Sequence, residues 1–253
     1  MDAQNQNYSQ QTQIILPHTG SQVTVKNFMA NVFSLMFLAL CISALLAFAF
    51  AKSPSLLLSL YSINLEQQTL SPNILGYIVM FAPLGFVLLM SFGYHKVSAP
   101  VMMILFILFS IIMGISFSFI LLTYTGSSIL GCFLSAAAMF GVMAVMGYTT
   151  KQDLTSFGRI MIMGLIGIVI ASVINLFLNS DTMGYVISFI GVMVFTGLTA
   201  YDVQKLKRIG EGIEAEGTPA VEVKKRAIMG ALSLYLDFIN LFLFLLRLFG
   251  SRK

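Results

Sequence analysis

The chain has few of the residues from which catalytic and metal sites are built. Its 253 residues include two cysteines, two histidines and no tryptophan. Cys41 and Cys132 each lie inside an apolar stretch, and His18 and His95 belong to no cluster with the spacing of metal ligands. This pattern supports neither a disulfide framework nor a zinc or haem site. We therefore predict that the protein holds no cofactor.

Charge is also scarce. Charged residues make up 9% of the chain, whereas 58% of its residues are hydrophobic and the mean hydropathy is +0.91. This composition is typical of a membrane protein with several spans and not of a soluble core. The formal charge of +4 does not indicate a nucleic-acid partner, because the basic residues lie in short connections between apolar segments. The predicted partner is the lipid bilayer.

Seven apolar segments are each long enough to cross a hydrocarbon core of about 30 Å as a helix. They lie at residues 28–51, 74–92, 101–122, 129–147, 160–178, 183–201 and 227–246. The sequence therefore predicts an all-α membrane protein, a seven-transmembrane-helix bundle whose membrane domain comprises residues 28–253. Residues 1–27 are rich in Gln, Asn, Ser and Thr and are predicted to form a polar cytoplasmic tail. In the polar connection 203–226, Gly217 and Pro219 argue against one continuous helix.

The basic residues predict the orientation of the chain. The tail and the connections after the second, fourth and sixth segments hold 10 of the 14 Lys and Arg residues, whereas the other three connections hold only Lys52. Because cytoplasmic connections carry an excess of Lys and Arg, we predict a cytoplasmic N-terminus. Arg247, Arg252 and Lys253 oppose this bias if the seventh segment crosses fully. A seventh segment that enters and returns is the alternative.

One carboxylate lies near the middle of the seventh segment. Asp237 is the only charged residue between Ala227 and Leu246. An ionised Asp at that depth costs roughly 3 kcal/mol on insertion scales, so it is expected to be protonated, to have a partner or to face an aqueous or protein interior. Helical spacing places other polar residues on the same face. These supporting residues are Ser233, Asn240 and Arg247.

A second carboxylate, Asp202, follows the sixth segment directly. Antiparallel packing of the sixth and seventh segments would bring Asp202 toward Asp237. Two carboxylates in a poorly hydrated place cannot both be ionised cheaply, so we predict that they share one proton. Taken alone, an acid at a helix end is usually only solvated, and a polar stripe such as that of Asp237 also serves simply to join helices.

Three motifs carry a resemblance to a known family. Residues 231–242 (ALSLYLDFINLF), followed by 245–250 (LLRLFG), resemble the C-terminal signature of the Bax inhibitor-1 family, also called TMBIM. Residues 199–204 (TAYDVQ) and 149–155 (TTKQDLT) support the resemblance, which covers nearly the whole chain. The polar tail and the composition fit a bacterial member, in the inner membrane of the cell.

The resemblance implies a fold and a function. The fold is a seven-helix bundle in which the last helix is central and wrapped by the other six. The function is a calcium leak whose gate is a pair of aspartates, carried over by motif to Asp202 and Asp237. A shared proton would hold the closed arrangement, and its loss would leave two like charges whose repulsion favours opening. The open gate would offer transient oxygen ligands to Ca²⁺, the permeant ion.

The chain departs from the family pattern after the second segment. Some members have an arginine there that reaches a latch aspartate, whereas this chain has His95 and Lys96. A lysine cannot reproduce a bidentate arginine contact, and a histidine titrates near neutrality. We therefore expect a different pH threshold in this protein if the latch needs arginine.

Three other functions compete with the leak. The first is a non-conducting membrane regulator that binds a membrane protease or another membrane protein. The second is an intramembrane aspartyl protease, but that class has a Gly-x-Gly before the second Asp and nine spans, whereas Asp237 follows Leu234-Tyr235-Leu236. The third is a proton-coupled transporter, for which the chain lacks an inverted repeat. We predict that the protein is not an enzyme.

Overall fold

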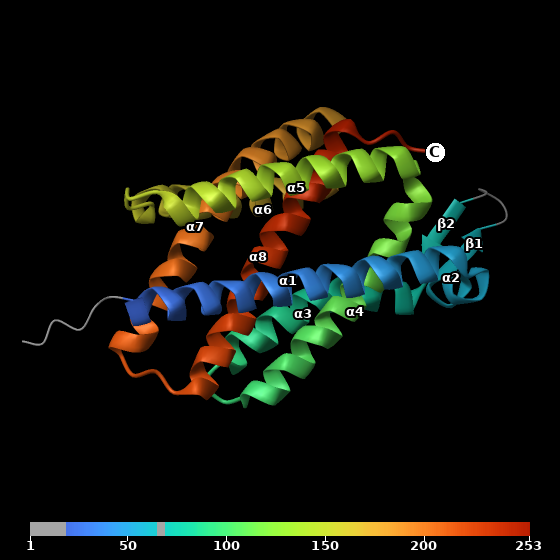
Figure 1. Ribbon diagram of the computed structural model, residues 1–253. Helices are drawn as coiled ribbons and strands as arrows, with labels where there is room; N and C mark the ends of the chain where they lie inside the picture. The colour runs from blue at the N-terminus through green and yellow to red at the C-terminus, as the bar shows by residue number, and fades with distance from the viewer. Residues whose placement is uncertain (1–18, 65–68) are drawn as a thin grey trace, which may run out of the picture.

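The chain forms a bundle of long helices in the computed structural model (Figure 1). The structure describes residues 19–64 and 69–253, and the predicted tail at residues 1–18 lies outside these ranges. In chain order the elements are α1 (Thr19–Lys52), α2 (Pro54–Leu60), β1 (Tyr61–Asn64), β2 (Thr69–Pro72), α3 (Ile74–Gly93), α4 (Ala99–Thr123), α5 (Gly126–Thr149), α6 (Thr155–Leu178), α7 (Asp181–Ala215) and α8 (Ala220–Phe249). Within the described ranges, seven of these helices are long and apolar enough to cross a membrane. The predicted fold class is therefore confirmed.

The seven long helices contain the seven predicted segments and extend past several of their ends. α1 begins at Thr19, so residues 19–27, which hydropathy assigns to the tail, are helical. α7 continues to Ala215, and Lys207 and Glu211 form an ion pair of 3.9 Å along this extension. Hydropathy marks only the apolar part of a helix, whereas polar residues with good helix propensity prolong it.

The chain turns sharply between α7 and α8. Gly217 adopts a φ of +59°, in the left-handed region that glycine enters without a steric penalty. Pro219 directly precedes the first residue of α8, where its fixed φ suits the start of a helix. The predicted break in the connection 203–226 is confirmed, although most of that connection is helical.

The connection between the first two spans has a fold of its own. α2 leads into an antiparallel hairpin in which Tyr61 of β1 pairs with Pro72 of β2. The ring of Tyr61 stacks on Phe119 near the end of α4, with 5.6 Å between centroids. Hydropathy predicts only a polar connection here, because strands of four residues are too short to show a periodic pattern.

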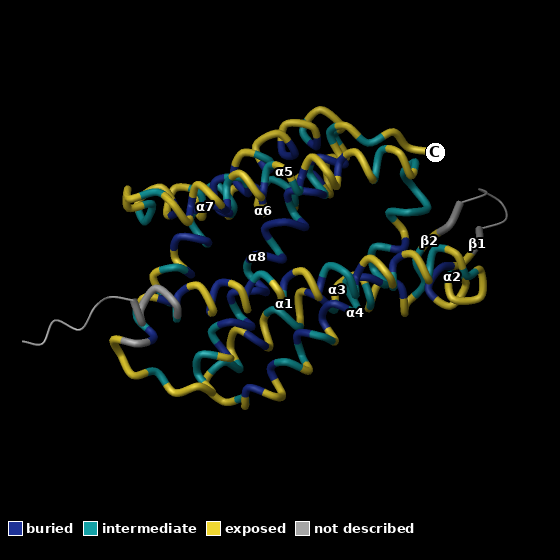
Figure 2. The backbone as a smooth tube through the Cα atoms, in the orientation of Figure 1, coloured by how far each residue is buried: buried dark blue, intermediate teal, exposed yellow. Residues whose placement is uncertain are grey.

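α8 is the central helix of the bundle. It crosses diagonally between a layer of α5, α6 and α7 and a layer of α1, α3 and α4 (Figure 1), and most of its length is buried (Figure 2). Its principal neighbours are α1, α4, α5 and α7, whereas α3 packs on α4 and α6 packs on α7. The apolar window of α8 is 67% buried, against 6% for α6. The central position is therefore confirmed, but four helices rather than six form most of the wrapping.

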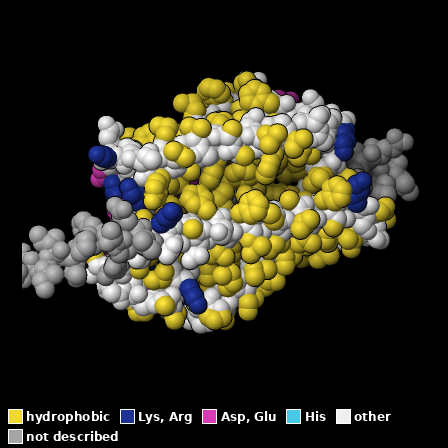
Figure 3. All heavy atoms as spheres, viewed as in Figure 1, with side chains coloured by type: hydrophobic (Ala, Val, Ile, Leu, Met, Phe, Trp, Pro, Cys, Tyr) yellow, Lys and Arg dark blue, Asp and Glu magenta, His cyan; other side chains and the backbone are white. Residues whose placement is uncertain are grey.

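The outer surface of the bundle is apolar. Figure 3 shows hydrophobic side chains across the middle of one face, with Lys and Arg near its two ends. Several large side chains on the outer helices are almost fully exposed, among them Ile74 at 83% and Phe177 at 84%. Apolar surface on this scale is unfavourable in water and suits a lipid environment. The protein is therefore embedded in a lipid bilayer.

α8 runs the full length of the bundle. Near its start, Glu222 contacts Tyr94 at the end of α3. Beyond its other end, Arg252 forms a bridge with Tyr124, and Lys253 donates a hydrogen bond to the carbonyl of Leu121 at the α4–α5 turn. A seventh segment that enters and returns is therefore wrong.

Hydroxyl groups join three helices in the core. Ser43 of α1 donates a hydrogen bond of 2.8 Å to the carbonyl of Ser110 on α4. Because the single hydroxyl proton of Ser43 is used in this bond, Tyr235 of α8 donates the second bond, also 2.8 Å long, to Ser43 Oγ. Tyr235 is fully buried, and its ring meets Phe109 edge-on. A buried tyrosine needs a partner of this kind, so these bonds fix α8 against α1 and α4.

The contact between α5 and α7 depends on one glycine. A Cβ atom at Gly147 would lie 2.2 Å from the carbonyl oxygen of Ala200, which belongs to the backbone of α7. No side chain can occupy that space without moving the two helices apart. By contrast, a Cβ at Gly141, on the same helix, would meet nothing within 4 Å.

We expect Gly147→Ala to destabilise the protein by about 1–3 kcal/mol, because overpacking forces α5 and α7 apart. Gly141→Ala is the matched control and is expected to be neutral or to stabilise by up to about 1 kcal/mol through helix propensity. Thermal unfolding of both variants in detergent micelles measures the difference. Equal melting temperatures for the two variants would contradict the close approach.

Candidate functional site

Asp202 lies on α7 at its interface with α8. Its Oδ2 accepts a hydrogen bond of 2.5 Å from the hydroxyl of Ser233. The two helices run antiparallel and pack along much of their length, so two residues far apart in the sequence meet. A cavity of about 200 Å³ opens beside the pair. Its polar and charged lining residues are Tyr94, Asp202, Lys205, Arg226 and Ser233.

Asp237 lies one turn further along α8 from Ser233. Only 5% of its surface is exposed, and its Oδ2 has no hydrogen-bond partner in the part of the chain that the structure describes. Asp202 is the charged residue that acts on it electrostatically. Ser233 thus links α8 to Asp202, Asp237 lies one turn further along the same helix, and no direct hydrogen bond links the two acids within the described residues. That they share a proton stays a prediction.

Two basic residues face the same cavity as Asp202. Lys205 and Arg226 both line it, and neither lies within ion-pair distance of Asp202 in the described part of the chain. Arg226 instead pairs with Glu216 at 3.4 Å and with Glu222 at 3.9 Å. Of the two, only Lys205 is without an ion pair in the described part of the chain.

Tyr94 ties the α3–α4 connection to the first turns of α8. Its hydroxyl donates a hydrogen bond to Glu222, and the ammonium of Lys225 lies 4.6 Å from its ring centroid and 3.7 Å from Glu222. Burial and, after it, the hydrogen bond to Glu222 raise the pKa of Tyr94 to about 12. Tyr94 is the member of this cluster that lines the cavity at Asp202.

The predicted latch residues lie elsewhere. His95 and Lys96 are exposed, and neither lines the cavity beside Asp202. Tyr94, the residue immediately before them, and Arg226 take those positions. Neither residue was predicted from the sequence. Tyr94 was missed because the latch was expected to be a cation, and Arg226 was missed because it lies in a polar connection without a periodic pattern.

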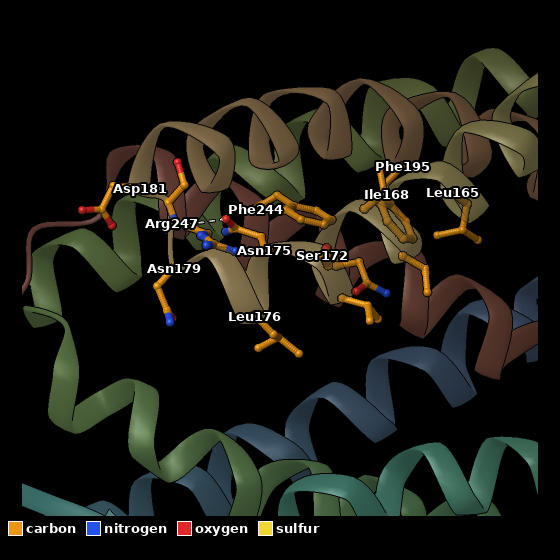
Figure 4. A pocket seen from close by; sticks show the side chains of 14 residues that line it. Leu165, Ile168, Ser172, Asn175, Leu176, Asn179, Asp181, Phe195, Phe244 and Arg247 are labelled. Atoms are coloured by element: carbon orange, nitrogen blue, oxygen red, sulfur yellow. Dashed lines mark hydrogen bonds between the residues drawn. The ribbon is translucent and has the colours of Figure 1, made fainter.

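The polar stripe predicted on α8 is divided between two cavities. Ser233 faces the cavity at Asp202, whereas Asn240 and Arg247 line a larger cavity of about 530 Å³ between α6, α7 and α8 (Figure 4). Asn240 also donates a hydrogen bond of 2.8 Å to the carbonyl of Leu236. Asp237 lies between the two groups, so the buried acid separates one cavity from the other along α8.

A second cluster of polar side chains holds the part of α7 that follows Asp202. Gln204 accepts a hydrogen bond from the backbone N–H of Leu154 and donates one to the carbonyl of Gln152. Arg208 pairs with Asp153 at 2.6 Å. Hydrogen bonds from Thr155 and then Arg208 hold the pKa of the Asp153 carboxyl well below its usual range. Two of the motifs quoted for the resemblance, 149–155 and 199–204, therefore meet in space and fix the register of α7.

The acids do not belong to a preformed metal site. Among the residues that the structure describes, no group of three His, Cys, Asp or Glu side chains lies close enough to hold a metal ion. Two carboxylates with a hydroxyl between them offer hard oxygen ligands of the kind that Ca²⁺ prefers. Binding of Ca²⁺ by Asp202 and Asp237 stays a prediction.

Comparison with known proteins identifies the family. The family model described as "Inhibitor of apoptosis-promoting Bax1" matches residues 25–253. The chain belongs to the Bax inhibitor-1 family. Among its relatives, the inner membrane protein YbhL of Escherichia coli is 42% identical over 240 residues, which cover 95% of this chain and 96% of YbhL. A protein of Borreliella burgdorferi is 39% identical over 243 residues, covering 95% and 99% of the two chains.

The Bax inhibitor-1 assignment places the motifs in context. The match includes α7 and α8 in full, and with them both acids, Ser233 and the contact between the motifs at 149–155 and 199–204. The predicted family and its bacterial character are therefore confirmed.

We expect Tyr94→Phe to lower stability by about 1 kcal/mol, since it removes a hydrogen bond to a charged, partly exposed group. Because the pKa of Tyr94 in the folded protein lies above the ordinary value near 10, its stabilising effect is complete below pH 10 and is lost as the pH rises through about 12. The difference between the tyrosinate absorbance titrations of wild type and variant is expected to show a midpoint near pH 12. Tyr77→Phe, an exposed tyrosine on α3, is the control and is expected to leave stability unchanged.

Proposed function

We propose that this protein is a pH-gated calcium leak of the bacterial inner membrane, with Asp202 and Asp237 as its gate. One observation carries the proposal. The carboxylate of Asp237 is buried without a hydrogen-bond partner in the described part of the chain, between two cavities that open at different levels of the same α7–α8 interface. An unpaired carboxylate in an apolar interior is costly to keep, so its presence favours a functional role over a packing role.

The closed arrangement is an apolar seal around Asp237. Phe195 and Leu198 of α7 and Phe238 of α8 are each at most 5% exposed. Phe195 lines the larger cavity and packs against Phe244 of α8, whereas Phe238 packs against Phe133 and Phe140 of α5. We infer that these side chains exclude water on both sides of Asp237. With the seal in place, an ion in either cavity meets buried side chains and not water. This is the arrangement expected of a closed gate.

Loss of the shared proton would open the gate. For an illustrative separation of about 5.4 Å, two like charges would repel by about 3 kcal/mol at an effective dielectric constant near 20. That energy changes a two-state equilibrium by roughly 100-fold. Lys205, which lines the cavity beside Asp202, favours the ionised form of that carboxylate, whereas Asp237 has Asp202 as its charged neighbour. Ionisation of Asp237 is therefore the step that decides opening.

Once open, the interface offers oxygen ligands along one line. The two carboxylates, the hydroxyl of Ser233 and the amide oxygen of Asn240 lie in succession along α7 and α8. Each helical turn supplies only a few of these oxygen ligands. The protein would therefore bind Ca²⁺ weakly at each position and release it to the next one. Weak, multi-site binding is what conduction requires.

A flux assay tests the proposal directly. Purified protein in liposomes that contain a calcium-sensitive dye is expected to leak Ca²⁺ faster as the pH rises. Asp237→Asn is expected to hold the flux at the closed level at every pH, because the neutral amide cannot ionise. Asp202→Asn is expected to remove the pH dependence as well. Glu211→Gln, which neutralises an exposed acid at the end of α7, is the control and is expected to behave as wild type.

Flux equal to that of empty liposomes would contradict the leak and favour the non-conducting regulator. Flux with unchanged pH dependence in Asp237→Asn would contradict the assignment of Asp237 to the gate. Circular dichroism and gel filtration of each variant separate loss of gating from loss of fold.

The proposed orientation has the N-terminus in the cytoplasm. The structure groups Lys52 with Arg252 and Lys253 at the end of the bundle that carries the hairpin, and most other basic residues belong to the opposite end. The excess of Lys and Arg at that opposite end supports a cytoplasmic location for it.

Single cysteines test the orientation. Both native cysteines are first removed by Cys41→Ala and Cys132→Ala. In this background, Ser127→Cys at the α4–α5 turn is expected to react with a membrane-impermeant maleimide in spheroplasts with an intact inner membrane. Lys96→Cys at the opposite end is expected to react only after lysis. The reverse pattern would invert the topology.

A further inference from the structure

The larger cavity has features that the gate does not use. It lies between the ends of α6 and α8 and the beginning of α7, at the opposite end of the bundle from Glu222 (Figure 4). Its volume of about 530 Å³ falls within the range of small-molecule sites, roughly 300–1,000 Å³. Polar groups line one part of it and apolar side chains line the rest. Such a division suits a ligand with a polar and an apolar part.

Arg247 lines this cavity as a partly solvent-exposed cation, and it is not paired with an anion in the described part of the chain. No carboxylate in the described part of the chain lies within ion-pair distance of its guanidinium. The guanidinium rests on Gly184 in the first turn of α7, where a Cβ would lie 2.5 Å from Nη2. The N-terminus of a helix favours negative charge, and Asp181 in the same turn already supplies one carboxylate. The guanidinium of Arg247 is the cation that an anion in the cavity would meet.

Asn175 adds a second donor to the same place. The side chain is 9% exposed and lines the cavity beside Arg247 (Figure 4). Its Oδ1 accepts a hydrogen bond from the backbone N–H of Ser180, which fixes the orientation of the amide and leaves Nδ2 without a hydrogen-bond partner among the described residues. The unpaired groups of the cavity are thus donors, and they call for an acceptor. Asp181 also lines the cavity, but its carboxylate points away from Arg247 (Figure 4).

The rest of the cavity is continuous with the lipid-facing surface. Val169, Val173 and Leu176 of α6 line it, and each is at least half exposed on the outside of the bundle. Phe195 and Phe244 form its inner wall. A ligand with hydrocarbon chains therefore reaches the cavity sideways from the bilayer, without crossing water.

We propose that this cavity is a phospholipid site, in which Arg247 and Asn175 hold the phosphate and the apolar wall of α6 receives an acyl chain. The phosphate offers several acceptor oxygens to the guanidinium fork and the amide. A soluble phosphate ion shares this chemistry, but it has no use for the apolar part of the cavity. The proposal does not depend on the calcium leak.

Binding to purified protein in detergent tests the site. Three probes are titrated and followed by native mass spectrometry: dioleoyl phosphatidylglycerol, dioleoylglycerol without phosphate, and inorganic phosphate. We expect one saturable phospholipid and little binding of the other two. Arg247→Gln is expected to weaken the phospholipid by at least about tenfold, since it removes charge-assisted hydrogen bonds. Arg252→Gln, an exposed arginine at the same end of the bundle, is the matched control and is expected to bind as wild type.

A second variant distinguishes loss of the binding site from misfolding of Arg247→Gln. Ser172→Phe fills the cavity from α6 and leaves every charge in place, so it is expected to lower phospholipid affinity by a similar factor. Bound phospholipid is also expected to raise the melting temperature of wild type and of Arg252→Gln but not that of Arg247→Gln.

Three outcomes would overturn the proposal. Equal loss of binding in Arg247→Gln and Arg252→Gln would indicate attraction to the surface and not a site. Equal binding of dioleoylglycerol would show that the phosphate is not recognised. Equal binding of inorganic phosphate would replace the lipid by a soluble anion.

Discussion

The protein is organised around the burial of one carboxylate in its central helix. Asp237 is only 5% exposed and lies within a wall of protein, because lipid cannot solvate a carboxylate. α1, α4, α5 and α7 provide that wall. The hydroxyl bonds of Ser43 and Tyr235 hold the first two against α8, and the close approach at Gly147 sets α5 on α7. The packing of the whole bundle therefore determines the environment of the Asp237 carboxylate.

The position of Asp202 depends on two polar clusters at one end of the bundle. Gln204 and Arg208 bind the α5–α6 connection to α7, and Tyr94 binds the α3–α4 connection to α8 through Glu222. Between them, α7 and α8 are held in the register that lets Ser233 reach Asp202. A change in protonation at the acids would act against these clusters, which makes them the elements on which a two-state gate would pivot.

The two cavities of the α7–α8 interface differ in their charged residues. Asp202, Lys205 and Arg226 line the first, whereas Asp181 and Arg247 line the second. A fixed positive charge at the far cavity would oppose a divalent cation. A lipid phosphate on Arg247 would remove that barrier, so the lipid site and the leak are compatible, although each stands on its own observations.

The sequence by itself determined the class and the spans, and it marked two acids as candidate site residues. Hydropathy found seven helices because lipid requires about 20 apolar residues for each crossing, and Asp237 was visible as a charge where none is expected. The hairpin and the long extension of α7 were not predictable from hydropathy, because that scale measures transfer to lipid and not pairing or helix length. The tertiary structure alone decided that Tyr94 and Arg226, not His95 or Lys96, stand beside Asp202, and that Arg247 belongs to a second cavity. These placements depend on how helices far apart in the chain pack together, which no local pattern of residues encodes.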